Sequence, residues 1–222
     1  HIIPIDEPLT VLYEDEYILA ADKPTNMPTH PSRGNSLITL AEAVVNYLGE
    51  DTVFRAVSRL DKDTSGIVVI AKNSYSAAIL GRNMKNGGIK KEYTALVSGV
   101  PTPSAGIIEA PIEREDGGGI RRCVREDGKY AKTEYETVGI TDENNAIVKI
   151  KLHTGRTHQI RVHFAYIGHP LLNDSLYSDK SDGIYSLHCH KVELDFLEKG
   201  HIVLESLPKF LSCGKEYPLP LK

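Results

Sequence analysis

The sequence VSRLDKDTSG at residues 57–66 runs directly into the aliphatic segment IVVIAK at residues 67–72. An apolar run this short predicts a buried β-strand, so the polar loop before it is held against a rigid element. Arg59 precedes Asp61 by two residues, and the small Thr64-Ser65-Gly66 turn follows it. Such neighbours can orient a carboxylate through local hydrogen bonds. The alternative is a surface loop in which Asp61 only closes an Asx turn.

The composition bounds the class of protein. A chain of 222 residues, 41% hydrophobic, is long enough for one large domain or two closely joined lobes. Its three cysteines (Cys123, Cys189 and Cys213) form no CxxC pair, so neither a disulfide framework nor a thiolate zinc site is expected. The chain has no stretch of eighteen apolar residues and no secretory signal at its start. These features predict a cytoplasmic protein without a membrane span.

The charge is unevenly distributed. A net charge of −4 is unusual for a nucleic-acid-binding domain, which often carries a strongly basic surface. Two runs are nevertheless basic: Arg82, Lys85, Lys90 and Lys91, and then Lys149, Lys151, Arg156 and Arg161. If both runs lined one cleft, they would attract phosphate groups. The alternative is that each is a solvated face.

Hydrophobic periodicity predicts an α+β fold. Strands are expected at residues 11–13, 17–21, 67–71, 89–97, 106–112, 130–138, 146–152, 184–194 and 201–207. Helices are expected from an N-cap at Ser36 to Leu48, from Asn73 or Ser74 to Gly87, and over residues 157–167. Residues 115–129 are rich in glycine and charge, which is typical of a mobile loop or hairpin tip. With no repeat or linker, the sequence predicts a single domain over residues 1–222, with a mixed, mostly antiparallel central sheet flanked by helices.

Metal and nucleophile patterns are weak in this sequence. His158 and His163 would lie about 140° apart on a helix, so they would not converge on one ion. His188 and His190 would share one face of a strand, but a third ligand is missing from the pattern. Asp61-x-Asp63 could hold Mg²⁺ for phosphoryl transfer, but no GxxxxGK[ST] phosphate loop accompanies it. A GxSxG nucleophile elbow is also absent from the sequence.

Three ordered motifs resemble those of the RluA-type pseudouridine synthases. They are Arg59-Leu60-Asp61-x-x-Thr64-Ser65-Gly66, Lys91-x-Tyr93-x-Ala95, and the run from Thr154 to His163, TGRTHQIRVH. Supporting matches are Lys23-Pro24, Gly128-Lys129-x-Ala131-x-Thr133 and Leu187-His188. The resemblance covers nearly the whole catalytic domain in the expected order.

Two positions depart from the family pattern. Ser58 stands where the family often has histidine, and Asn26 stands where the lysine-proline loop often has glycine. Asparagine tolerates the left-handed backbone better than most residues, so the second departure is mild. The chain also starts at the catalytic domain, so we expect no N-terminal S4-like RNA-binding domain, either by nature or by truncation.

The resemblance implies a pseudouridine synthase fold with a catalytic cleft across the sheet. It implies that a uridine in structured RNA, either rRNA or tRNA, is flipped out of the stack and isomerised to pseudouridine. Asp61 would be the essential carboxylate, Arg161 would pair with it, and Tyr93 would stack on the uracil or remove the C5 proton. The RNA-binding and substrate-binding residues would be Arg59, Thr64, Arg156 and His158. Arg121, Arg122 and Arg125 could also contact the RNA backbone.

The resemblance implies neither a cofactor nor a metal, and it implies RNA as the partner of what is expected to be a monomer. Two other hypotheses stay open at this point. One is an RNA-binding or chaperone module on the same fold that has lost catalysis. The other is a metal-dependent phosphotransferase that uses Asp61 and Asp63.

Overall fold

The structure is a computed structural model that describes residues 2–32, 34, 36–179, 181, 183, 185–196 and 199–211. Its chain divides into two compact units. Unit 1 comprises His1–Lys91 and Cys189–Leu207, and unit 2 comprises Glu92–His188 and Pro208–Lys222. The chain passes from one unit to the other within strands β4 (Ile89–Val97) and β10 (Leu187–Phe196), and again after Leu207. The expectation of a single domain stays a prediction.

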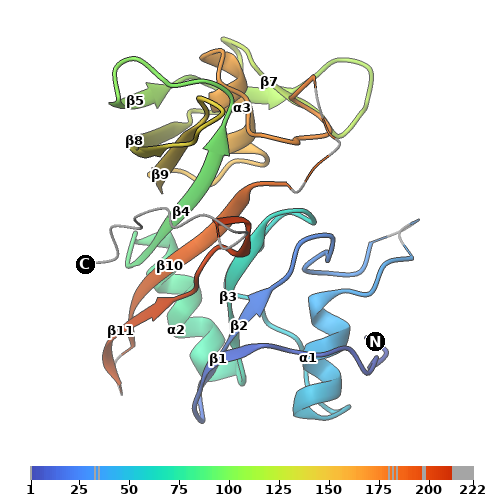
Figure 1. Ribbon diagram of the computed structural model, residues 1–222. Coiled ribbons are helices and arrows are strands. Elements are labelled where there is room, and N and C mark those ends of the chain that lie inside the picture. The colour runs from blue at the N-terminus through green and yellow to red at the C-terminus, as the bar shows by residue number, and fades with distance from the viewer. Residues whose placement is uncertain are drawn as a thin grey trace. The chain divides into compact units, whose positions relative to one another are not determined.

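The sheet of unit 1 has the strand order β1-β2-β3-β10-β11 (Figure 1). Its other strands are β1 (Val11–Glu14), β2 (Ile18–Lys23), β3 (Ser65–Ala71) and β11 (Gly200–Glu205). β2 pairs antiparallel with β3, so that Lys23 lies opposite Gly66. β3 is buried from Gly66 to Ala71, in accord with its continuous aliphatic sequence. The loop that carries Asp61 therefore enters the sheet beside the end of β2.

Two capped helices belong to unit 1. In α1 (Leu40–Leu48) the hydroxyl of Thr39 accepts from the Glu42 N–H, and the Glu42 carboxylate accepts from the Thr39 N–H at 2.7 Å. The start predicted at Ser36 is therefore wrong, because the capping box needs its acid three residues after the cap. The start of α2 (Ser74–Lys85) is confirmed, with Asn73 as its N-cap.

The sheet of unit 2 is antiparallel, with the strand order β4-β9-β8-β5. Its further strands are β9 (Ala146–Leu152), β8 (Lys132–Ile140) and β5 (Ala105–Glu109). Tyr93 of β4 and Tyr135 of β8 both lie opposite Ile150 of the central strand β9. The strands expected at residues 130–138 and 146–152 are confirmed as β8 and β9, which pair with each other, although β8 begins two residues later than expected.

The single strand expected at residues 106–112 is wrong, because this segment is divided between β5 and a strand of a separate two-stranded sheet. β5 ends at Glu109, and Ile112 begins β6 (Ile112–Arg114), which pairs with β7 (Arg122–Val124). Pro111 lies between the two strands and has no N–H to donate, so the ladder is interrupted there. The hairpin β6-β7 occupies most of the segment predicted to be a loop or hairpin tip. Ile184, the predicted start of another strand, lies outside the described residues, and β10 begins at Leu187.

Helix α3 (Gln159–Tyr166) begins two residues after the predicted start. The physical reason is the backbone of His158, whose φ of 59° is left-handed and cannot continue a right-handed helix. α3 packs on β7 and β8, and Figure 1 shows it beside β7. A short 3₁₀ turn, η1 (Lys209–Leu211), ends the described part of the chain.

The predicted fold class is confirmed. The described residues form an α+β structure in which every pairing with a resolved register is antiparallel. Among them, no helix has the length and apolar character needed to cross a membrane. The predicted catalytic cleft across the sheet would involve both units and stays a prediction.

Gly66 allows a close approach that a side chain would block. Its φ is +110°, and an added Cβ would lie 2.3 Å from the backbone oxygen of Cys189. Gly49 has a similar φ of +107°, but nothing lies within 4 Å of its added Cβ. We expect Gly66→Ala to lower the free energy of unfolding by at least about 2 kcal/mol more than Gly49→Ala, because only Gly66→Ala adds overpacking to the backbone strain. Urea denaturation measures both, and equal losses would contradict the role of the close approach.

Candidate active site

The loop that carries Asp61 is fixed by backbone hydrogen bonds on both sides of the carboxylate. The Thr29 hydroxyl donates to the carbonyl of Leu60 at 2.8 Å and accepts from the Leu60 N–H at 3.2 Å. The Thr64 N–H donates to the carbonyl of Asp61 at 3.2 Å. Leu60 and Thr64 are buried, whereas Asp61 is partly accessible. The main chain is thus anchored immediately before and after an acid that stays open to solvent.

A buried lysine holds the same loop from the neighbouring strand. Lys23, 0% exposed, donates through Nζ to the carbonyls of Pro24 and Met27 at 2.8 Å and of Lys62 at 3.1 Å. Burial lowers the pKa of Lys23 to about 7, and the carboxylates of Asp63, Asp61 and Asp22 act in the opposite direction. Lys23 therefore ties the residue after Asp61 to the lysine-proline loop.

Asn26 completes the turn of that loop. Its φ is 57°, which places it in the left-handed region. This agrees with the expectation that asparagine replaces a glycine there. The next residue, Met27, donates its N–H to the carbonyl of Lys62 at 3.1 Å, so the two loops are joined by main-chain bonds as well.

Tyr93 lies on β4 in unit 2 and is 6% exposed. Its register opposite Ile150 places it on a paired strand, as predicted. A tyrosine on a strand that is paired to a central neighbour is held more rigidly than one on a loop.

Helix α3, which carries Arg161, is anchored by a network that starts at Gln159. The Gln159 amide nitrogen donates to the Lys132 carbonyl and to the Thr133 hydroxyl, both at 3.0 Å. The amide oxygen accepts from the Thr154 hydroxyl at 2.8 Å and from the Arg156 N–H at 3.0 Å. Gln159 thus ties the start of the helix to β8 and to the preceding turn, whereas the His158 side chain makes no capping bond.

His163 fixes the same helix one turn later. The Ala110 carbonyl, 2.9 Å from Nε2, can only accept, so Nε2 carries the hydrogen. Nδ1 then accepts from the Thr133 hydroxyl at 2.9 Å. Burial lowers the pKa of His163, and the bond to the Ala110 carbonyl acts in the opposite direction. The neutral ring is the form that this network accommodates.

Arg161 is buried in unit 2 and forms a bidentate ion pair with Asp174. Its Nε–H donates to Oδ2 at 2.8 Å, and its Nη2–H donates to Oδ1 at 2.6 Å. The rings of Tyr177 and Tyr185 lie 5.1 and 5.5 Å from the guanidinium carbon. The sequence predicted a pairing of Arg161 with Asp61, whereas Asp174 was not foreseen.

The remaining predicted site residues divide between the units. Arg59 is exposed and Thr64 is buried in the Asp61 loop of unit 1. In unit 2, the Arg156 Nε–H donates to the Tyr130 carbonyl at 2.9 Å, and His158 Nδ1 lies 2.9 Å from the Tyr177 hydroxyl. Tyr93 and Arg161 also belong to unit 2, whereas Asp61 belongs to unit 1. The expected meeting of Asp61 with Tyr93 and Arg161 therefore stays a prediction.

Carboxylates neutralise part of the predicted basic surface. Glu92 pairs with Lys149 at 2.7 Å and lies 3.8 Å from Lys151. In the β6-β7 hairpin, Arg121 pairs with Glu115, and Arg125 pairs with Asp116 and Asp127. These arginines are thus held within the hairpin by its own acids.

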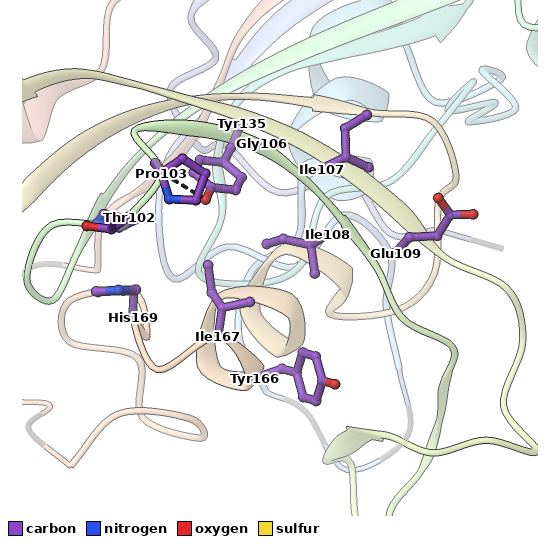
Figure 2. A pocket seen from close by; sticks show the side chains of 11 residues that line it. Thr102, Pro103, Gly106, Ile107, Ile108, Glu109, Tyr135, Tyr166, Ile167 and His169 are labelled. Atoms are coloured by element: carbon purple, nitrogen blue, oxygen red, sulfur yellow. Dashed lines mark hydrogen bonds between the residues drawn. The ribbon is translucent and has the colours of Figure 1, made fainter.

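A surface pocket lies outside the predicted site residues. A surface pocket of about 380 Å³ in unit 2 is lined by apolar groups such as Ile107 and Ile167 and by His169 and Glu109 (Figure 2). Its carboxylate, that of Glu109, accepts from the Tyr130 hydroxyl at 2.7 Å. In the described part of the chain, no group of three or more His, Cys, Asp and Glu side chains is placed to hold a metal ion.

The chain matches known proteins over most of its length. Residues 17–166 match the family model described as RNA pseudouridylate synthase, and this range contains every predicted site residue. An uncharacterized RNA pseudouridine synthase of Bacillus subtilis is 37% identical over 193 residues, covering 86% of this chain and 68% of the relative. The ribosomal large subunit pseudouridine synthase D of Nitrosomonas europaea is 36% identical over 215 residues, covering 90% of this chain and 62% of the relative.

Solved structures agree with this match. The human RNA pseudouridylate synthase domain containing 1 has a TM-score of 0.79 at 25% identity, with 93% of this chain and 86% of that chain covered. The human domain containing 4 has a TM-score of 0.75 at 24% identity, with 91% and 90% covered. The fold is therefore shared with these proteins. The chain spans 68%, 66% and 60% of the lengths of three curated relatives.

Lys23→Met tests the anchoring of the Asp61 loop. Methionine has a similar length but no donor, so three carbonyls lose their partner, and we expect the free energy of unfolding to fall by about 1–3 kcal/mol. Chemical denaturation measures this loss. The matched control is Lys62→Met, whose side chain is 47% exposed and should change stability by less than about 0.5 kcal/mol. Equal effects of the two substitutions would contradict the anchoring role.

His163→Gln tests the neutral ring in unit 2. The pKa of His163 is lower in the folded chain than its ordinary value of 6.5, so the unfolded chain binds the proton more readily. Stability is therefore lost as the pH falls below about 6.5 towards the folded-state pKa. We expect the wild type to lose more melting temperature between pH 7 and pH 5 than His163→Gln. The same loss in both proteins would show that His163 does not contribute.

Proposed function

Because the chain belongs to the RNA pseudouridylate synthase family, we propose that it isomerises uridine in RNA to pseudouridine. In this reaction the glycosidic bond between N1 and C1′ breaks, the uracil turns, and a bond forms between C5 and C1′. The proton on C5 is released and N1 is protonated, so no group is gained from a cosubstrate. The chemistry needs a group that acts on the ribose or the base, a base for the C5 proton, and a site that admits a single nucleotide.

The family match over residues 17–166 carries this proposal. The matched range includes the Asp61 loop, the strand that bears Tyr93 and the helix that bears Arg161. Each of the three side chains is positioned by its own unit: Asp61 by the anchored loop, Tyr93 by the β4-β9 pairing, and Arg161 by α3 and Asp174. Such rigid placement of polar groups supports a catalytic role for them.

Asp61 is proposed as the essential carboxylate. It acts either by attack on the ribose or the base or by promoting a glycal route, and both roles need the ionised form. Its partial accessibility is compatible with contact to a substrate, since the carboxylate follows buried Leu60 and precedes exposed Lys62. Arg161 is proposed to stabilise this carboxylate, and Tyr93 to stack on the uracil or accept the C5 proton.

RNA recognition is proposed for the residues around these groups. A uridine within folded RNA has to be flipped out, at a cost of a few kcal/mol of unstacking. Exposed Arg59 is suited to fill the vacated position or to bind the flipped phosphate, and Thr64, Arg156 and His158 are proposed to contact the RNA. The hairpin arginines Arg121, Arg122 and Arg125 are further candidates for the backbone, because the exposed Arg121–Glu115 pair can be exchanged for a phosphate at small cost.

Ribosomal RNA is the substrate class that the named relatives favour. Several are called ribosomal large subunit pseudouridine synthase D, including those of Nitrosomonas europaea and Xanthomonas campestris. Transfer RNA is the alternative. Action on either RNA in a bacterial cell would place the protein in the cytoplasm, and we propose that it acts there as a monomer without cofactor or metal.

Asp61→Asn tests the proposed reaction. The amide is isosteric but carries no charge, so we expect tritium release from [5-³H]uridine-labelled ribosomal RNA to fall by at least about 10³-fold. Mapping of pseudouridine in RNA from cells with and without the gene identifies the substrate for this assay.

The matched control is Asp63→Asn, two residues away in the same loop. Asp63 lies 3.6 Å from Lys62 Nζ, an ion pair of partly exposed groups. We expect Asp63→Asn to keep activity within about threefold of the wild type, because an exposed pair contributes little. Full activity of Asp61→Asn would overturn the proposal. Undiminished tritium release in excess EDTA would remove the alternative of a metal-dependent phosphotransferase.

A further inference from the structure

We infer that Asp174 is a positioning residue that fixes the direction of the Arg161 guanidinium. This inference rests on the proposed function, because it assigns Asp174 a part in the same reaction. Asp174 lies thirteen residues after Arg161, in the segment between α3 and β10, and it belongs to none of the three motifs.

The geometry of the pair restricts the guanidinium in its plane. Asp174 is 0% exposed and Arg161 is 4% exposed, so the two charges are shielded from water. The two bonds from Nε and Nη2, at 2.8 and 2.6 Å, form a fork that fixes both the position and the rotation of the group. One bond alone would leave the guanidinium able to pivot.

The carboxylate is itself held by its own turn. Its Oδ1 accepts from the N–H of Leu176 at 2.9 Å and of Tyr177 at 3.2 Å. The Asp174 carbonyl accepts from the Ser178 N–H at 2.9 Å. Asp174 is therefore a fixed acceptor, and the arginine adapts to it.

Aromatic rings restrict the group outside its plane. The ring of Tyr177 lies 5.1 Å and that of Tyr185 lies 5.5 Å from the guanidinium carbon, both within the range of cation–π attraction. Tyr177 also joins this site to the β6-β7 hairpin. Its hydroxyl accepts from the Arg122 N–H at 2.8 Å, and its ring lies 5.4 Å from the Arg121 guanidinium.

Stability alone is a weak reason for this arrangement. A buried ion pair usually gives little net stability, and apolar side chains of similar volume often replace one without loss. A buried guanidinium that is aligned by a fork and two rings has instead one fixed orientation. In the proposed reaction Arg161 stabilises the Asp61 carboxylate, so Asp174 acts on catalysis through Arg161.

Asp174→Asn is the test, because it keeps the size of the side chain but offers one acceptor instead of two. We expect kcat in the tritium-release assay to fall about 100-fold, as for a misplacement of about 1 Å, with KM within about threefold of the wild type. A kcat within threefold of the wild type would overturn the inference. The matched control is Ile108→Ala, a buried substitution on β5 of unit 2, which should destabilise the fold without this loss of kcat.

A double variant separates positioning from support of the fold. If Asp174 acts through Arg161, Arg161→Met combined with Asp174→Asn should be no slower than Arg161→Met alone. If the loss of kcat in the double variant equals the product of the losses in the two single variants, the inference is overturned. If Asp174→Asn fails to fold, Arg161→Lys is the deciding variant, because lysine keeps the charge but cannot form the two-bond fork. A loss of kcat of about 100-fold in Arg161→Lys supports the inference. A kcat of at least half the wild-type value overturns it.

A spectroscopic readout separates this inference from the proposed function. The Nε–H resonance of Arg161, assigned by its absence in Arg161→Lys, should shift and broaden in Asp174→Asn but not in Ile108→Ala. An unchanged resonance in Asp174→Asn would overturn the positioning role. If the wild type forms no pseudouridine in any RNA, the proposed function fails, and the resonance still shows whether Asp174 fixes Arg161.

Discussion

The Asp61 loop depends on the hydrogen bonds that the buried Lys23 side chain donates to main-chain carbonyls. Three carbonyls from two loops converge on one nitrogen, and two of them flank the bend at Asn26. A buried cation is costly unless acceptors surround it, so the loops that supply these acceptors are held in one conformation. The same cation lies near the carboxylates of Asp61 and Asp63, which joins the anchoring of the loop to its electrostatics.

Unit 2 also contains a buried cation that surrounding groups compensate. The Arg161 guanidinium is buried, and a carboxylate and two aromatic rings compensate its desolvation. The helix that carries it begins without a side-chain cap, and Gln159 and His163 anchor it through Thr133 instead. In both units, hydrogen-bond acceptors compensate a buried cation at or beside a candidate catalytic side chain, which is typical of sites that need a fixed geometry.

A chain with a net charge of −4 that is proposed to act on RNA needs local regions of positive charge. Here the acids lie next to the basic residues: Glu92 beside Lys149 and Glu115 beside Arg121. The Glu115–Arg121 pair is exposed, so it contributes little to stability and is screened by salt, and a phosphate can displace the Glu115 carboxylate at small cost. The net charge of the chain is therefore a poor guide to its partner.

The sequence by itself determined the local elements and the family. Continuous aliphatic residues predicted β3, hydrophobic periodicity predicted the strands β8 and β9, and Asn73 predicted the start of α2, because these signals act over a few neighbouring residues. The motifs around Asp61, Tyr93 and Arg161 were also readable, since each is a contiguous pattern. The predicted ends of elements were wrong where a cap or a local backbone conformation set them, as at Thr39, Pro111 and the left-handed His158.

Only the tertiary structure decided the partners of the buried cations. Nothing local to Lys23 points to the carbonyl of Lys62, thirty-nine residues away, and no periodicity links Arg161 to Asp174. Both contacts arise because strand pairing and loop closure bring distant segments together, and the need to satisfy a buried charge then selects whichever acceptor lies there. Sequence patterns record which residues follow one another, whereas the compensation of a buried charge depends on which residues share a volume.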